Sequence, residues 1–194
     1  MCGIAGIFYK SAERKVRPET VERMLGLQSH RGPDGTGVYV DGPFGMGMCR
    51  LSIIDEKDHR MPYVNEDGRL RMVYNGEVYN HRDLQAGFRR EHCIVEGSDG
   101  EAVLHGWEEK GISLLDDLNG MYAFALYDRE QKELTLVRDK AGEKPLYYYE
   151  DAEVFVFASE IKAILAVARP EINPNPVSYR CFEFTCGKET LFKD

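Results

Sequence analysis

Met1-Cys2-Gly3-Ile4-Ala5-Gly6-Ile7 opens the chain. The short apolar run at residues 4–9, punctuated by glycines, is typical of a buried strand. The small second residue favours removal of Met1, and the chain would then begin with a cysteine carrying a thiol and a free α-amine. An α-amine titrates at about 7.7 to 8.0 and can take a proton at neutral pH, so one residue could supply nucleophile and base. Cysteine also occurs at position 2 by chance, and the position alone leaves both interpretations open.

Composition and charge set the broad class of the chain. It has 194 residues, 43% hydrophobic and 30% charged, which is ordinary globular composition and fits one domain or two small ones. The formal net charge is -8 and no basic run occurs, so neither nucleic acid nor an anionic membrane is expected as a partner. No apolar stretch approaches the ~20 residues that span a bilayer, and the start does not resemble a signal peptide.

The cysteines and histidines bear on compartment and metal content. The cysteines have irregular spacing and form no CxxC motif, which favours a reducing, cytoplasmic compartment. No histidine has a metal-ligand spacing with a cysteine, so no metal is predicted. The cysteines are Cys2, Cys49, Cys93, Cys181 and Cys186, and the histidines are His30, His59, His81, His92 and His105.

Apolar periodicity predicts short strands in runs, with helices grouped between them. The strands are expected at residues 4–9, 37–40, 44–48, 51–54, 70–74, 121–127, 134–138, 146–149 and 154–158. The helices are expected from Pro18, over 82–90 with Asn80 as N-cap, over 99–110 and over 161–168. This arrangement indicates antiparallel sheets with helices outside, an α+β fold, and no nucleotide-binding motif is present.

Seven segments, in order, resemble the glutaminase domain of asparagine synthetases, which are class II N-terminal-nucleophile amidotransferases. They are residues 1–6, 30–34, 50–55, 74–80, 97–101, 118–125 and 138–148. The resemblance implies a four-layer αββα sandwich of two antiparallel sheets over residues 1–168. Residues 169–194 resemble the family segment that leads into an ATP-binding synthetase domain.

The resemblance also implies the chemistry of glutamine amide hydrolysis. Cys2 would be the nucleophile, and the Asn75 side-chain amide with the Gly76 backbone N–H would stabilise the oxyanion. Without the resemblance, Asn-Gly is more typical of a type I′ hairpin turn. Arg50 would bind the glutamine α-carboxylate in a bidentate fork, although an arginine is more often a solvated surface charge.

Further residues of the pocket follow by the same resemblance. Asp99 would bind the α-ammonium, and it is also suited to a helix N-terminus. Glu77 and the backbone of Leu51, Ser52, Ile53 and Ile54 would line the rest. Four residues that recur in the family, Arg31, Asp34, Arg138 and Asp139, are better explained as loop-ordering salt bridges than as catalysts.

The sequence differs from the family at two positions, one at the start of the helix expected over 99–110 and one on the side expected to face the synthetase domain. Gly100 stands where the family usually has threonine or cysteine, and Ala141 where a bulky aromatic is common. No cofactor is expected in these residues, because ATP and magnesium would belong to the synthetase domain. The ammonia would go to such a domain in a longer chain or to a separate protein, and a homo-oligomer is compatible with the sequence.

Two other hypotheses stay open at this point. The domain could belong to another class II system, against which residues 50–55 and 144–148 weigh. It could also be a non-catalytic module that binds glutamine, against which the intact Cys2, Asn75, Gly76 and Asp99 weigh.

Overall fold

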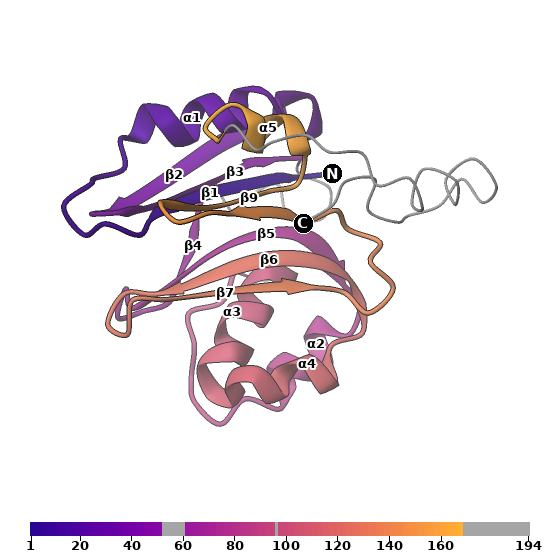
Figure 1. Ribbon diagram of the computed structural model, residues 1–194. Coiled ribbons are helices and arrows are strands. Elements are labelled where there is room, and N and C mark those ends of the chain that lie inside the picture. The colour runs from indigo at the N-terminus through magenta and orange to yellow at the C-terminus, as the bar shows by residue number, and fades with distance from the viewer. Residues whose placement is uncertain (52–60, 96, 169–194) are drawn as a thin grey trace.

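Four layers make up the fold in the computed structural model, which describes residues 1–51, 61–95 and 97–168. Helices cover a five-stranded sheet, which packs face to face on a four-stranded sheet covered by further helices (Figure 1). Every paired strand in both sheets is antiparallel. The predicted α+β class and the αββα sandwich are therefore confirmed.

The first sheet has the strand order β2-β3-β1-β9-β8. Its strands are β1 (Gly3–Tyr9), β2 (Gly35–Asp41), β3 (Phe44–Arg50), β8 (Tyr147–Glu150) and β9 (Val154–Ala158). Helices α1 (Pro18–Gly26) and α5 (Ile161–Leu165) lie over its outer face (Figure 1). Strand β1 is central and covered on both faces, which explains why it is a nearly continuous apolar run in the sequence.

The second sheet has the order β4-β5-β6-β7. Its strands are β4 (Tyr63–Val64), β5 (Leu70–Val78), β6 (Gly120–Asp128) and β7 (Glu133–Arg138). Helices α2 (His81–Ala86), α3 (Asp99–Lys110) and α4 (Leu114–Asp117) lie on its outer side, and 3-10 turns occur at Ser29–Arg31 and Gly111–Ser113.

The alternation of side chains along β5 decides which residues reach the space between the sheets. The Arg71 guanidinium lies 4.6 Å from the centre of the Tyr39 ring of β2, so odd-numbered residues of β5 face the first sheet. Even-numbered residues face the helices, and Tyr74 bonds to a residue of α3. In the first sheet, the stacking of Phe44 on Tyr127 of β6 places even-numbered residues of β3 on the inner face.

The helix ends show where tertiary contacts override local pattern. Helix α3 has the predicted bounds, whereas α2 ends at Ala86 and α5 at Leu165, each earlier than predicted. Asn80 does stand at the N-cap of α2, but its side chain bonds instead to the backbone at Asp117 and Asn119. Most of the strand predicted at residues 51–54 lies outside the described residues.

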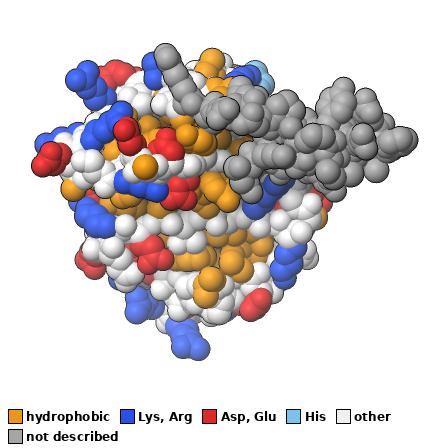
Figure 2. Space-filling view, in the orientation of Figure 1, with side chains coloured by type: hydrophobic (Ala, Val, Ile, Leu, Met, Phe, Trp, Pro, Cys, Tyr) orange, Lys and Arg blue, Asp and Glu red, His pale blue; other side chains and the backbone are white. Residues whose placement is uncertain are grey.

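The helices and the surface charge bear on the expectations drawn from composition. In the described ranges, no helix is both long and apolar enough to cross a bilayer. On the face drawn in Figure 2, basic and acidic side chains are interspersed, and no basic patch dominates it. This face offers no concentrated positive charge for a nucleic-acid backbone.

Candidate active site

Cys2 lies just before β1, at the end of the first sheet. Its side chain packs against the core between the sheets, and its Sγ is 3.9 Å from the Leu51 carbonyl oxygen. Gly3 is paired with Cys49, so one further step of the antiparallel register sets Cys2 opposite Arg50. Cys2, Arg50 and Leu51 therefore come together at one sheet end, and Met1 in front of them is exposed.

Buried side chains hold the backbone that follows Cys2. Three successive carbonyls each accept a hydrogen bond from one of them: Cys2 from Arg31 Nε (3.0 Å), Gly3 from Cys49 Sγ (3.6 Å) and Ile4 from Gln28 Nε2 (3.3 Å). The Ser159 hydroxyl accepts from the Ile4 N–H at 3.0 Å. Sequence reasoning did not identify Gln28, Cys49 or Ser159 as site residues, and together they fix the position of the thiol.

Arg31 has a second set of contacts besides the Cys2 carbonyl. Its Nη1 forms an ion pair with Glu160 at 3.2 Å, and its side chain is only 10% exposed. Its Nη2 is buried without a hydrogen-bond partner among the described residues. The loop-ordering salt bridge expected for Arg31 is present, but the same guanidinium also holds the nucleophile candidate.

Asn75 and Gly76 lie within strand β5, not in a hairpin turn. They are paired with Ala123 and Tyr122 of β6. Asn75 is an odd-numbered residue of β5, so its side chain points toward the first sheet, which carries Cys2 and Arg50 on its inner face. It is 1% exposed, and its Nδ2 is buried with no partner in the described part of the chain. An unpaired buried amide is costly unless something binds it, so it marks a site for an acceptor atom.

The Gly76 backbone points to the side of β5 away from β6. Its partner Tyr122 directs its own N–H and carbonyl to Asp139 beyond the other edge, so Gly76 points the opposite way. The ladder between β4 and β5 has ended by this point, since its last pair joins Tyr63 to Met72. A Cβ built on Gly76 would lie 2.7 Å from the Met121 carbonyl oxygen, which explains the glycine.

Asp99 is the first residue of α3 and is bound to β5. Ser98 caps the helix, and its Oγ accepts from the Glu101 N–H at 3.3 Å. Asp99 Oδ2 accepts from the Tyr74 hydroxyl at 2.7 Å and from the Val78 N–H at 2.9 Å. Asp99 therefore stands at a helix N-terminus and also lies close to Gly76 on β5.

Tyr74 is the buried donor to this acid. Burial above all, then the Asp99 carboxylate and, more weakly, the Cys2 thiol, raise the pKa of Tyr74 well above its ordinary value. The phenol therefore stays neutral and donates to Asp99.

The remaining sequence-predicted residues fall around this centre. Arg50, 8% exposed, ends β3, and Glu77 stands opposite Met121 near the end of β5. Ser52, Ile53 and Ile54 lie outside the described residues.

Arg138 and Asp139 order the loop after β7. The Arg138 guanidinium donates to the carbonyls of Gly142 (2.6 Å) and Lys144 (2.7 Å). Asp139 accepts from the N–H groups of Glu143 and Lys144 as well as that of Tyr122. Both side chains therefore order the loop, as expected for Arg138 and Asp139. They do so through hydrogen bonds to backbone groups and not through the expected salt bridges.

Tyr63 fills the space around Gly100, where the sequence was expected to depart from the family. A Cβ on Gly100 would lie 2.6 Å from Tyr63 Cζ and 2.8 Å from its hydroxyl oxygen. Tyr63 in turn packs edge-on against Tyr74, with ring centroids 6.4 Å apart. The glycine therefore lets one aromatic ring lie between β5 and the start of α3.

Comparison with known proteins identifies the family of this chain. Residues 1–194 match the family described as glutamine amidotransferase domain. The chain is 39% identical over 168 residues to asparagine synthetase (glutamine-hydrolyzing) 2 of Bacillus subtilis (strain 168), covering 86% of this chain and 22% of that protein. It is 40% identical over 172 residues to asparagine synthetase B (glutamine-hydrolyzing) of Escherichia coli (strain K12), covering 87% of this chain and 31% of that protein.

A solved structure agrees in fold. Glutamine phosphoribosylpyrophosphate amidotransferase from B. subtilis, complexed with ADP and GMP, matches with a TM-score of 0.69 at 21% identity. The match covers 86% of this chain and 43% of that one. The family match over the whole chain, together with the αββα fold and the arrangement around Cys2, shows that the chain belongs to the glutamine amidotransferase domain family.

Proposed function

We propose that this domain hydrolyses the side-chain amide of L-glutamine, with Cys2 as the nucleophile. The observation that carries the proposal is the buried Nδ2 of Asn75, which has no hydrogen-bond partner in residues 1–51, 61–95 and 97–168 and points toward the sheet that holds Cys2. It is a donor already in place for an oxyanion that forms only during the reaction. Losing one such donor typically costs about 100- to 1000-fold in rate.

The reaction begins after Met1 is removed. The free α-amine of Cys2 takes the thiol proton, and the sulfur attacks the side-chain carbonyl carbon of glutamine. The oxyanion accepts hydrogen bonds from Asn75 Nδ2 and the Gly76 N–H. When the tetrahedral intermediate collapses, the C–N bond breaks and the proton leaves with the nitrogen as ammonia. Water then cleaves the γ-glutamyl thioester, which releases glutamate and restores the thiol.

Two charged residues recognise the ends of glutamine that do not react. Arg50 binds the α-carboxylate through its planar fork, and its place opposite Cys2 in the register supports this role. Asp99 binds the α-ammonium through the carboxylate oxygen Oδ1, because the contacts with Tyr74 and Val78 go to Oδ2. Glu77, Leu51 and the predicted residues 52–54 complete the pocket.

The ammonia serves an amidation elsewhere. The two relatives above are named as glutamine-hydrolysing asparagine synthetases, and this chain spans 22% and 31% of their lengths. By analogy, the acceptor is an activated carboxylate bound by a synthetase domain, in the same protein or a separate one. ATP and magnesium belong to that domain. We place the end of the amidotransferase domain near residue 168, because residues 169–194 resemble the family segment that precedes a synthetase domain.

The proposed compartment is the reducing cytoplasm. Cys2, Cys49 and Cys93 are free thiols, as expected where disulfides do not persist. A thiol nucleophile also works only in the reduced state. Homo-oligomer formation stays a prediction from the sequence.

The deciding experiment measures glutamate release from glutamine by protein whose Met1 has been removed, verified by intact mass. Cys2→Ala should abolish release while leaving the folded structure intact, because the side chain is small and lies before β1. The matched control is Cys93→Ser, which changes an exposed thiol and should keep full activity. Activity that survives Cys2→Ala would overturn the proposal. Glutamine binding without hydrolysis in the processed wild type would favour the non-catalytic module instead.

A further inference from the structure

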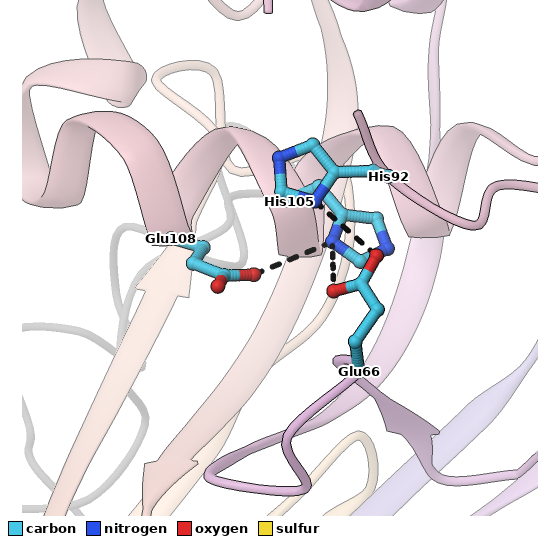
Figure 3. Close-up of side chains that lie close together, drawn as sticks. All are labelled: Glu66, His92, His105 and Glu108. Carbon is cyan, nitrogen blue, oxygen red and sulfur yellow. Dashed lines mark hydrogen bonds and ion pairs between the residues drawn. The ribbon is translucent and has the colours of Figure 1, made fainter. Parts of the chain in front are cut away.

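Two histidines and two glutamates meet on the outer side of the second sheet, away from Cys2. They are Glu66, His92, His105 and Glu108, and one ligand atom from each lies within 4.8 Å of all the others. Figure 3 shows the four side chains converging from three separate segments. Glu66 comes from the turn between β4 and β5, His92 from the connection between α2 and α3, and the other two from α3 itself.

The local sequence makes part of this arrangement. His105 and Glu108 are three residues apart in α3, so they lie on the same face of the helix. The two histidine rings stack at 4.3 Å between centroids, which brings His92 onto that face. The histidine side chains are only 2% and 3% exposed, whereas Glu66 is 38% exposed. The cluster is therefore enclosed, with one side reachable from solvent through Glu66.

The contacts within the cluster are long for hydrogen bonds between charged groups. His105 Nδ1 lies 3.5 Å from an oxygen of Glu66 and 3.5 Å from an oxygen of Glu108, and His92 Nδ1 lies 3.3 Å from Glu66. Charge-assisted contacts are usually about 2.7–2.9 Å. Elsewhere in this protein the exposed Lys132–Asp41 pair reaches 2.7 Å.

The two 3.5 Å separations from His105 Nδ1, to Glu66 Oε2 and to Glu108 Oε2, match ligand atoms around a common centre, and all four ligand atoms lie within 4.8 Å of one another. Zinc bonds to histidine nitrogen and carboxylate oxygen are about 2.0–2.2 Å, and neighbouring corners of such a tetrahedron are then about 3.3–3.5 Å apart. Two imidazole nitrogens with two carboxylate oxygens form a ligand set suited to a first-row divalent ion. Mg²⁺ and Ca²⁺ prefer all-oxygen ligands, and the two buried imidazoles disfavour them.

A further residue orients the second histidine in the way metal sites require. His92 Nε2 lies 3.3 Å from a carboxylate oxygen of Glu109, which leaves Nδ1 directed at the cluster. Glu109 is itself held by the backbone N–H groups of Arg89 and Arg90.

We propose that Glu66, His92, His105 and Glu108 bind one Zn²⁺ ion in a structural, four-coordinate site. The ion would tie the β4–β5 turn and the α2–α3 connection to helix α3, whose first residue is Asp99. The sequence analysis predicted no metal because it looked only for cysteine–histidine spacings. It did not consider glutamate ligands from a distant turn, and the zinc site proposed here departs from that prediction. The site is independent of the proposed hydrolysis of glutamine.

The test is zinc binding by the whole chain after treatment with a chelator. Calorimetry should give one equivalent of Zn²⁺, and zinc at about 100 times Kd should raise Tm by about 5–10 °C. Mg²⁺ and Ca²⁺ at the same concentration should produce no comparable shift. Co²⁺ in place of zinc should show the visible absorption of a tetrahedral site.

The variants assign the binding to these residues. Glu66→Gln should weaken zinc binding by about tenfold or more, and it can still accept the Cys93 N–H, so the turn is expected to fold. His105→Gln should abolish binding, and the double change Cys2→Ala with Cys93→Ser should preserve it because no thiol takes part. If His105→Gln does not fold, Glu66→Gln decides alone. Absence of zinc binding, or binding unchanged by Glu66→Gln, would overturn the proposal.

Discussion

The Arg31 guanidinium contacts both the Cys2 carbonyl oxygen and the Glu160 carboxylate. We expect Arg31→Ala to lower kcat for glutamine hydrolysis by about 10- to 100-fold with little change in KM, because a small displacement of the nucleophile is costly. Glutamate release at several glutamine concentrations measures both constants. Arg17→Ala, at an exposed arginine, is the control and should change neither. A raised KM with unchanged kcat would contradict this positioning role.

The sequence predicted some site residues and missed others, depending on whether the residue lies in a recognisable motif. Cys2, Asn75 and Asp99 lie in motifs, and the motifs identified them as candidates. Gln28 and Ser159 were missed, although both are fully buried. A polar residue that holds a backbone carbonyl has the same local pattern as one in solvent, so only the fold distinguishes them.

At the scale of elements, the start of α3 depends on the space around Gly100. We expect Gly100→Ala to lower the free energy of unfolding by about 1–3 kcal/mol, because the new Cβ meets the rigid Tyr63 ring. This should exceed the gain of up to about 1 kcal/mol from replacing glycine in a helix. Urea unfolding measures the change. The control Gly26→Ala in α1, where a Cβ would meet nothing within 4 Å, should be neutral or stabilising.

The partner variant Tyr63→Leu distinguishes this packing effect from a backbone effect. It removes the ring atoms that a Cβ at Gly100 would meet, so the double variant should be less destabilised than the sum of the single changes. Strict additivity would mean that the glycine is required for another reason.

The ends of helices were predictable only where no distant residue competes for the backbone. Helix α3 has the predicted bounds because Ser98 and Gly111 end its pattern locally. The helix predicted at residues 82–90 stops at Ala86, and the N–H groups of Arg89 and Arg90 donate to the Glu109 carboxylate on α3. Strand β4 was missed because two residues are too few to show a period.

For the whole molecule, the sequence predicted the class of fold but not the order of its strands. Strand β1 lies between β3 and β9, which are about 40 and 150 residues further along the chain. Such pairings depend on which faces meet in the folded state and leave no local periodicity. The layered arrangement was accessible only through the resemblance of the motifs to a family.

Acid stability is a property of the whole molecule, because buried and half-buried carboxylates join its elements. Asp128, Asp139 and Glu160 all have lowered pKa values: burial acts to raise each pKa, and hydrogen bonds and nearby cations together outweigh it. A carboxylate with a lowered pKa stabilises the fold fully above its unfolded value, about 3.9 for aspartate. That contribution is lost as pH falls through the folded value. The free energy of unfolding should therefore decrease steeply below about pH 4.

The variant Asp139→Asn isolates one part of this decrease. Asparagine cannot bind the N–H groups of Tyr122, Glu143 and Lys144 as a carboxylate does, so the variant should lose about 2–3 kcal/mol at pH 7. The gap between variant and wild type should shrink as pH falls from 5 to 3, because protonation removes the same interaction from the wild type. Urea unfolding at each pH measures that gap, and Asp116→Asn at an exposed position is the control. A gap that stays constant with pH would mean that Asp139 acts through shape and not through charge, and the acid sensitivity would then have to arise from the other buried carboxylates.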